Sequence, residues 1–131
     1  CRISIDGWEV GLAICYDIRF PELFSFLTKD KPLDALIVPA AFTYQTGKDH
    51  WLTLTRARAI DQLSFVLCSN QVGQHTNEKR SFGHSLVYSP WGDLLYSAEE
   101  HIGTGVVSLD KDLIAKARAR LNPFRDRAIY S

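Results

Sequence analysis

Three apolar runs alternate with two helical segments along the first half of the chain, and this order restricts the fold more than any other feature. The runs are Trp8–Cys15, Ala35–Ala40 and Ser64–Ser69. One helix is predicted to start at Pro21, where a missing amide donor costs nothing, and another over about 49–62, where apolar residues recur at helical spacing. Parallel strands need such crossover connections, so the order predicts an α/β fold with parallel central strands. The uninterrupted run at 35–40 predicts a strand covered on both faces.

Antiparallel pairs are predicted on both sides of this parallel centre. Asp6-Gly7 suits a tight turn between Ile3–Ile5 and the strand that begins at Trp8. Farther along, the proline and glycine of Ser89–Asp93 suit a turn between strands at 84–88 and 94–96. The sheet is therefore expected to be mixed.

The remaining segments are assigned from local composition. Loops are expected at Phe42–Gly47 and at the polar run His75–Arg80. Gly105–Leu109 is predicted as a further strand, and Asp110 as the cap of a helix that follows it. The tail, 122–131, shows no periodicity. No repeat or linker divides the chain.

Charge and cysteine usage exclude several classes of partner. Fifteen basic residues balance fifteen acidic ones without long runs of one sign, which argues against nucleic acid and membrane surfaces. No apolar segment approaches the roughly 18 to 20 residues that span a bilayer. The three cysteines, Cys1, Cys15 and Cys68, lack CxxC spacing, so neither a disulfide framework nor a zinc site is expected. A reduced, cytoplasmic setting follows.

Cys15 stands where a central strand ends and a helix soon begins. Ligands of α/β folds bind at such strand ends, and a nearby helix start favours the thiolate, which is the nucleophilic form of cysteine. The alternative is a small apolar core residue, and spacing alone favours this alternative. Cys68 lies inside an apolar strand and is predicted to be core.

The run Ala13–Glu22, AICYDIRFPE, resembles the nucleophile signature of the nitrilase superfamily of carbon-nitrogen hydrolases. Further motifs of the chain resemble those of the family and occur in the same order along the sequence. They are Pro39–Phe42, Gly47, His50-Trp51, Arg56–Ile60, Asn70-Gln71, Gly73, Gly83–Ser85, Pro90–Gly92 and the tail 122–130. The resemblance covers the whole chain. It is greatest to the small amidases related to omega-amidase and deaminated-glutathione amidase.

This resemblance implies a fold and an assembly. Residues 1–131 would form the C-terminal portion of a carbon-nitrogen hydrolase domain, which is the C-terminal half of a four-layer αββα sandwich with a mixed sheet. The N-terminal portion of the domain would precede Cys1. A homodimer or higher homo-oligomer is expected for the complete protein.

The resemblance also implies a reaction. Cys15 would attack the carbonyl of a small carboxylic acid amide, the backbone amide of Tyr16 would help to hold the oxyanion, ammonia would leave, and water would hydrolyse the thioester. No metal or organic cofactor is needed. In the family a glutamate base and a lysine precede the cysteine, and no acid or lysine of this sequence matches them, so these residues alone are expected to be inactive. Two alternatives remain, namely a non-catalytic binding or scaffold protein and, less favoured, a thiol redox sensor at Cys15.

Several other residues are candidates for substrate contact. Ala41, Phe42 and Thr43 follow the strand beside the nucleophile strand, and small residues with one aromatic would leave room for a short aliphatic substrate. Ordinary core packing is the alternative for Phe42. Asp17 and Arg19 could touch substrate, but bracing of the turn is favoured.

The two histidines in family motifs, His50 and His84, are expected to be structural, because no second ligand stands at metal spacing. An amide is preferred over a nitrile or carbamoyl substrate because of the subfamily resemblance.

Overall fold

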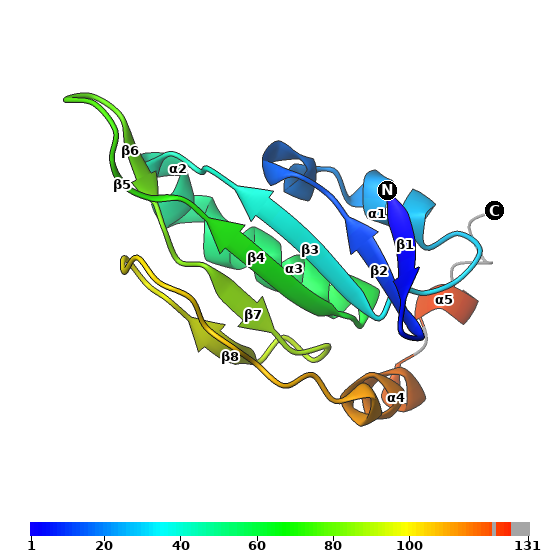
Figure 1. Cartoon of the computed structure of the whole chain (residues 1–131). Helices are drawn as coiled ribbons and strands as arrows, with labels where there is room; N and C mark the ends of the chain where they lie inside the picture. Colours follow the sequence, from blue (N-terminus) through cyan, green and yellow to red (C-terminus); the bar gives the residue numbers. More distant parts are fainter. Residues whose placement is uncertain (122, 127–131) are drawn as a thin grey trace.

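The computed structural model describes residues 1–121 and 123–126 and shows an α/β fold built on a mixed sheet. Six strands form this sheet in the order β1-β2-β3-β4-β7-β8, and β5 and β6 form a separate pair (Figure 1). The strand bounds are β1 Arg2–Ile5, β2 Trp8–Leu12, β3 Ala35–Ala40, β4 Phe65–Asn70, β5 Val72–Gln74, β6 Arg80–Phe82, β7 Leu86–Tyr88 and β8 Leu94–Ser97.

The helices are of three kinds. The α-helices are α1 Pro21–Leu27, α2 Tyr44–Thr46, α3 Leu52–Gln62, α4 Lys111–Arg120 and α5 Pro123–Asp126. A 3-10 helix spans Cys15–Arg19, and a π-helical turn spans Gly47–Trp51 between α2 and α3. No helix in the described part of the chain has the length and apolarity to cross a membrane.

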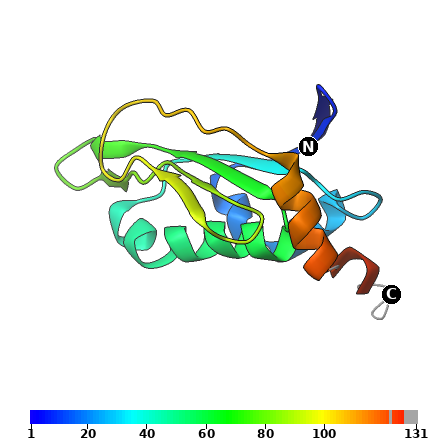
Figure 2. The ribbon, with the colours of Figure 1, turned by 90° about the horizontal axis from the view of Figure 1, so that it is seen from below.

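The predicted parallel centre is confirmed. β2 pairs with β3, and β3 pairs with β4, all in parallel, with α1 and α3 in the two crossovers. Figure 2 shows both helices on the same face of the sheet. The carboxyl ends of β2, β3 and β4 therefore meet at one edge, where the 3-10 helix and the loop after β3 begin.

Both predicted hairpins are present at the sides of this centre. β1 pairs antiparallel with β2 through a turn in which Asp6 and Gly7 have positive φ angles of 47° and 79°. That geometry fits the right-handed twist of the strands. β7 pairs antiparallel with β4 and with β8.

The main core fills the space between the sheet and the two crossover helices. Phe24 of α1, Trp51 of the π-helical turn, and Leu36 and Val66 of the sheet are all 0% exposed. Their burial removes apolar surface from water, which is the principal source of stability. This core fixes the helices, and with them the segments at the carboxyl edge.

The opposite face of the sheet, called here the open face, is only partly covered. At one end, Ile114 of α4 packs with Val10, Ala35 and Phe65. Past this end of the sheet, an extended segment at 101–110, called here the strap, passes over the face (Figure 2). Ile37 in the middle of β3 remains 37% exposed, so the expectation that this strand is covered on both faces is wrong in the described chain.

Other expectations also differ from the structure. The second strand ends at Leu12 rather than Cys15, because the backbone turns into the 3-10 helix. Gly105–Leu109 is extended but pairs with no strand of the described chain, since it crosses the open face instead of extending an edge.

The two expected loops hold more structure than predicted. Phe42–Gly47 contains α2, and the polar run 75–80 lies at the tip of the β5–β6 hairpin, which projects beyond the main sheet (Figure 1). The predicted cap is confirmed, since the Asp110 side chain accepts a hydrogen bond from the Asp112 amide at 2.9 Å. Of the tail, residues 122 and 127–131 lie outside the described part.

Candidate active site

Cys15 occupies a sharp turn at the carboxyl edge of the sheet. Its φ angle is +46°, in the left-handed region that residues other than glycine rarely adopt. The turn is closed by two reciprocal bonds, because the Ile14 amide donates to Asp17 Oδ2 and the Asp17 amide donates to the Ile14 carbonyl, each at 2.9 Å. Asp17 therefore braces the turn, as favoured from the sequence. The half-buried Cys15 is held in one strained conformation.

The proposed oxyanion donor sits beside it. Tyr16 is the second residue of the 3-10 helix, and amides in a first turn have no carbonyl partner within their helix. The Tyr16 ring is 64% exposed and packs edge-on against Phe20, with 5.7 Å between the ring centroids. This position leaves the Tyr16 amide without a carbonyl partner inside the helix, and its role as an oxyanion donor stays a prediction.

Arg19, the last residue of the same helix, contacts both sides of the candidate site. Its guanidinium carbon lies 5.4 Å from the Tyr16 ring centroid and 5.5 Å from that of Phe42, both within cation-π range. Its Nη2 lies 3.2 Å from Nδ1 of His50. Arg19 thus joins the Cys15 turn to the loop after β3 and to the π-helical turn, and it forms no ion pair with Asp17.

The loop after β3 is divided between exposed and buried residues. Ala41 and Thr43 are exposed, whereas Phe42 is 5% exposed and packs on Trp51, with 4.7 Å between the ring centroids. Core packing, the alternative considered from the sequence, therefore accounts for most of the Phe42 surface. The contact with the Arg19 guanidinium ties its ring to the candidate site.

Asn70 is a residue of this edge to which the sequence assigned no role. It is 6% exposed at the end of β4, and its Oδ1 accepts from the Phe42 amide at 2.9 Å. Its Nδ2 donates to the Gly83 carbonyl at 2.6 Å. The only available signal was the Asn-Gln pair at the end of an apolar run.

A cavity of about 350 Å³ opens beside the turn on the open face. It is lined by Leu12, Ala13, Ile14, Asp17, Ile37 and Pro39. Neither Cys15 nor the residues 41–43 line it. The described residues thus bring Cys15 and the loop after β3 to one edge of the sheet, but neither of them lines this cavity.

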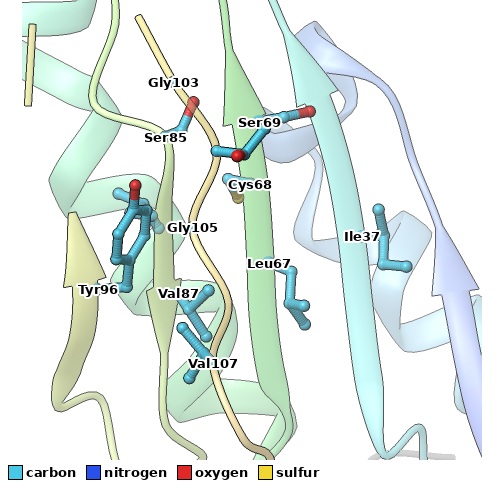
Figure 3. Close-up of a pocket in the computed structure, with 12 residues that line it drawn as sticks. Ile37, Leu67, Cys68, Ser69, Ser85, Val87, Tyr96, Gly103, Gly105 and Val107 are labelled. Atoms are coloured by element: carbon cyan, nitrogen blue, oxygen red, sulfur yellow. The ribbon is translucent and has the colours of Figure 1, made fainter. Parts of the chain in front are cut away.

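A second cavity, also about 350 Å³, lies between the sheet and the strap (Figure 3). Cys68 and Ser69 of β4, Ser85, Tyr96 of β8 and Gly105 of the strap are among its lining residues. Cys68 is 4% exposed, and burial raises the pKa of its thiol well above the ordinary value. It remains a neutral thiol, and the prediction that Cys68 is core is confirmed.

The two histidines in question have different surroundings. His84 stacks on Phe82 with 4.1 Å between the ring centroids, and its backbone carbonyl accepts from Trp51 Nε1 at 2.9 Å. These contacts agree with a structural role. His50 is exposed and has Arg19 as its polar contact.

Comparison with known proteins places this arrangement in a family. Residues 2–119 match the carbon-nitrogen hydrolase family. The deaminated glutathione amidase of Synechocystis is 40% identical over 119 residues, which are 91% of this chain and 43% of the relative. The chain therefore spans less than half the length of that relative.

Solved structures show the same relation. The crystal structure of the C. elegans NitFhit protein superposes with a TM-score of 0.91 at 35% identity, over 99% of this chain and 32% of that one. Saccharomyces cerevisiae Nit3, a member of branch 10 of the nitrilase superfamily, gives a TM-score of 0.82 at 33% identity, over 93% of this chain and 45% of that one. Sequence and fold agree, and the chain belongs to the carbon-nitrogen hydrolase family.

Proposed function

We propose that this chain supplies the nucleophile of an amidase that hydrolyses a small carboxylic acid amide to the acid and ammonia. The observation that carries the proposal is the Cys15 turn, in which a thiol is held at a φ of +46° where a parallel strand ends. Strained backbone at such a position is typical of catalytic residues. The amidase names of the relatives support the same reaction class.

The proposed reaction proceeds through a thioester. The Cys15 thiolate forms a bond to the amide carbon, and the negative charge on the oxygen is held by the Tyr16 amide. The carbon-nitrogen bond then breaks, and the nitrogen takes a proton from a general acid and leaves as ammonia. Water attacks the thioester and gives up a proton to the same group, which restores the general acid, and the carbon-sulfur bond breaks to release the carboxylic acid and the Cys15 thiolate. No metal or organic cofactor enters these steps.

The general base and a cationic group are proposed to come from outside this sequence. Within residues 1–121 and 123–126, no carboxylate or ammonium group bonds to the Cys15 thiol. The chain also spans 43% of the Synechocystis relative, so a larger part of such a protein lies elsewhere. The 131 residues on their own are accordingly expected to be inactive.

The substrate is proposed to carry a carboxylate besides its amide. Among the described residues Arg19 has no carboxylate partner, although its guanidinium lies against Tyr16 and Phe42 at the site. A guanidinium presents paired donors that match a carboxylate. A monoamide of a short dicarboxylic acid would place its carboxylate on Arg19 and its acyl chain along Ala41–Thr43.

The test uses the full-length protein and succinamic acid. Intact-mass spectrometry after rapid quenching should show a succinyl adduct, peptide mapping should place it on Cys15, and ammonia should be released. Cys15→Ala should abolish both signals, whereas Cys1→Ala at an exposed cysteine should keep them. Ammonia release by Cys15→Ala would show that the assigned mechanism is wrong. An unmodified, inactive wild type would favour the binding or scaffold alternative.

A homo-oligomer and a cytoplasmic location are proposed as well. Phe26 on α1 and Ile60 on α3 are 74% and 45% exposed, which leaves apolar surface available for a second copy. All three cysteines are free, as expected in a reducing compartment. Light scattering of the purified full-length protein tests the assembly, and a monomer would contradict it.

A further inference from the structure

The contact between Arg19 and His50 defines the protonation state of the imidazole. Nη2 of Arg19 and Nδ1 of His50 are 3.2 Å apart. A guanidinium has only donors, so Nδ1 must be the acceptor. The imidazole is therefore neutral in this contact and carries its proton on Nε2. A protonated ring would have a donor at both nitrogens and could not accept this bond.

His50 is supported by a firmly packed segment. It lies in the π-helical turn Gly47–Trp51, a kind of turn that is frequent at functional sites. Its neighbour Trp51 is 0% exposed and donates from Nε1 to the His84 carbonyl at 2.9 Å. At the start of the turn, an added Cβ at Gly47 would lie 2.3 Å from Cβ of Phe82, so the turn fits tightly against β6. The position of His50 relative to Arg19 is thus set by packing.

Aromatic rings and a hydrogen bond have different effects on Arg19. The rings of Tyr16 and Phe42 attract the guanidinium from two sides but impose little direction in its plane. The bond to His50 occupies one Nη2 donor and so fixes which donors remain for a ligand. Losing this bond would free the guanidinium to rotate, and a positive imidazole would also repel it.

We propose that His50 is a positioning residue, which aims Arg19 at the carboxylate of the substrate only while its imidazole is neutral. This inference rests on the proposed function, because it assigns the Arg19 guanidinium to a carboxylate-bearing amide. Histidine is the residue type whose side chain most readily changes charge in the pH range from about 8 to 5.5. The preference for acidic amides is therefore expected to weaken as the pH falls through that range.

Other charged groups near this contact do not replace it. On the π-helical turn, Lys48 and Asp49 are exposed neighbours of His50. On the facing 3-10 helix, the Asp17 carboxylate accepts from the Ile14 amide at 2.9 Å. Glu22 is exposed in the first turn of α1. Within the described chain, the polar contact of the His50 ring is the one with Arg19.

The experiment compares two amides of similar size on the full-length enzyme, succinamic acid with a carboxylate and butyramide without one. The measured quantity is the ratio of their kcat/KM values from pH 8 to pH 5.5. Effects on the Cys15 thiol act on both substrates and cancel in the ratio. For the wild type, the ratio should fall about tenfold at the acid end of this range, because a protonated ring cannot accept the bond from Arg19. The fall should appear in KM for succinamic acid rather than in kcat.

Two His50 variants and one control complete the design. His50→Asn places an acceptor oxygen near Nδ1 that does not titrate, so the ratio should stay high down to pH 5.5. His50→Ala should give the low ratio at every pH. The control, His101→Asn, changes an exposed histidine whose Nδ1 contacts the Ala98 carbonyl, and it should keep the pH dependence of the wild type.

The outcomes separate this inference from the proposed function. Suppose that the enzyme hydrolyses succinamic acid and that the ratio of kcat/KM values changes with pH in His50→Asn as it does in the wild type. This result would overturn the role of His50 and leave the amidase assignment standing. A wild-type ratio that does not change with pH would overturn it equally. Absence of hydrolysis of both amides by the wild type would overturn the amidase assignment and the role of His50 with it.

Discussion

The side chain of Asn70 holds the backbone of Phe42, whose amide donates to Asn70 Oδ1 at 2.9 Å from 28 positions away in the sequence. The same side chain donates to the Gly83 carbonyl. Asn70→Leu would leave both buried backbone groups without this partner, at a cost of about 1 to 3 kcal/mol for each. We expect the free energy of unfolding of the full-length protein to fall by about 2 kcal/mol or more, measured with urea. Asn77→Leu, at an exposed hairpin position, should change it by less than about 0.5 kcal/mol.

The φ angle of Cys15 leads to a prediction about stability that is separate from catalysis. A left-handed conformation costs residues with a Cβ about 1 to 2 kcal/mol, and glycine adopts it freely. Cys15→Gly should therefore be more stable to urea than Cys15→Ala by about 1 kcal/mol, with both variants inactive. The opposite order would indicate that the turn is unstrained in solution.

Glu9 should make stability depend on pH in the acid range. Hydrogen bonds from Lys31, then Arg2 and Ser4, lower the pKa of its carboxyl from an ordinary value of 4.5 to about 2. As the pH falls, the Glu9 carboxylate therefore takes up its proton in the unfolded chain before it does so in the folded chain. The contribution of Glu9 to the free energy of unfolding is thus complete above about pH 4.5 and is lost toward pH 2. Glu9→Gln should flatten the slope of unfolding free energy against pH in this window. Glu78→Gln, at an exposed position, should retain the slope.

Gly47 is expected to tolerate no side chain. An added Cβ would lie 2.3 Å from Cβ of Phe82, and Phe82 is 6% exposed, so it has little room to move. Overpacking of this kind costs about 1 to 3 kcal/mol. Gly47→Ala should lower the melting temperature by several degrees, measured by circular dichroism. Gly103→Ala, where nothing lies within 4 Å of the added Cβ, is the matched control and should leave it unchanged.

The parallel centre of the fold could be predicted because its signals are local. Each buried run of β3 and β4 is continuous in the sequence, and Pro21 marks the start of α1 at its first residue. The end of β2 was missed by three positions, because the apolar run continues to Cys15 while the backbone has already turned. No glycine marks that turn, so composition gives no sign of the positive φ angle.

Pairing of strands depends on neighbours that a segment's own sequence does not describe. Residues 105–109 have the composition of a strand, yet they pair with no strand of the described chain. The same limit applies to the site. Arg19 and His50 are 31 positions apart, and their contact depends on the orientation of a π-helical turn. The sequence named both residues, but their contact required the packed structure.

The strap has a practical consequence for handling the protein. Gly103, Gly105 and Val107 line the cavity above the sheet, while Ile102 and Val106 are 91% and 98% exposed. Apolar groups therefore lie on both sides of an extended segment, next to the half-exposed Ile37 of the sheet. Extended apolar segments with unpaired backbone adhere to one another in water. When these 131 residues are prepared alone, they are thus expected to have low solubility. A sample that is clear when dilute should become turbid when it is concentrated.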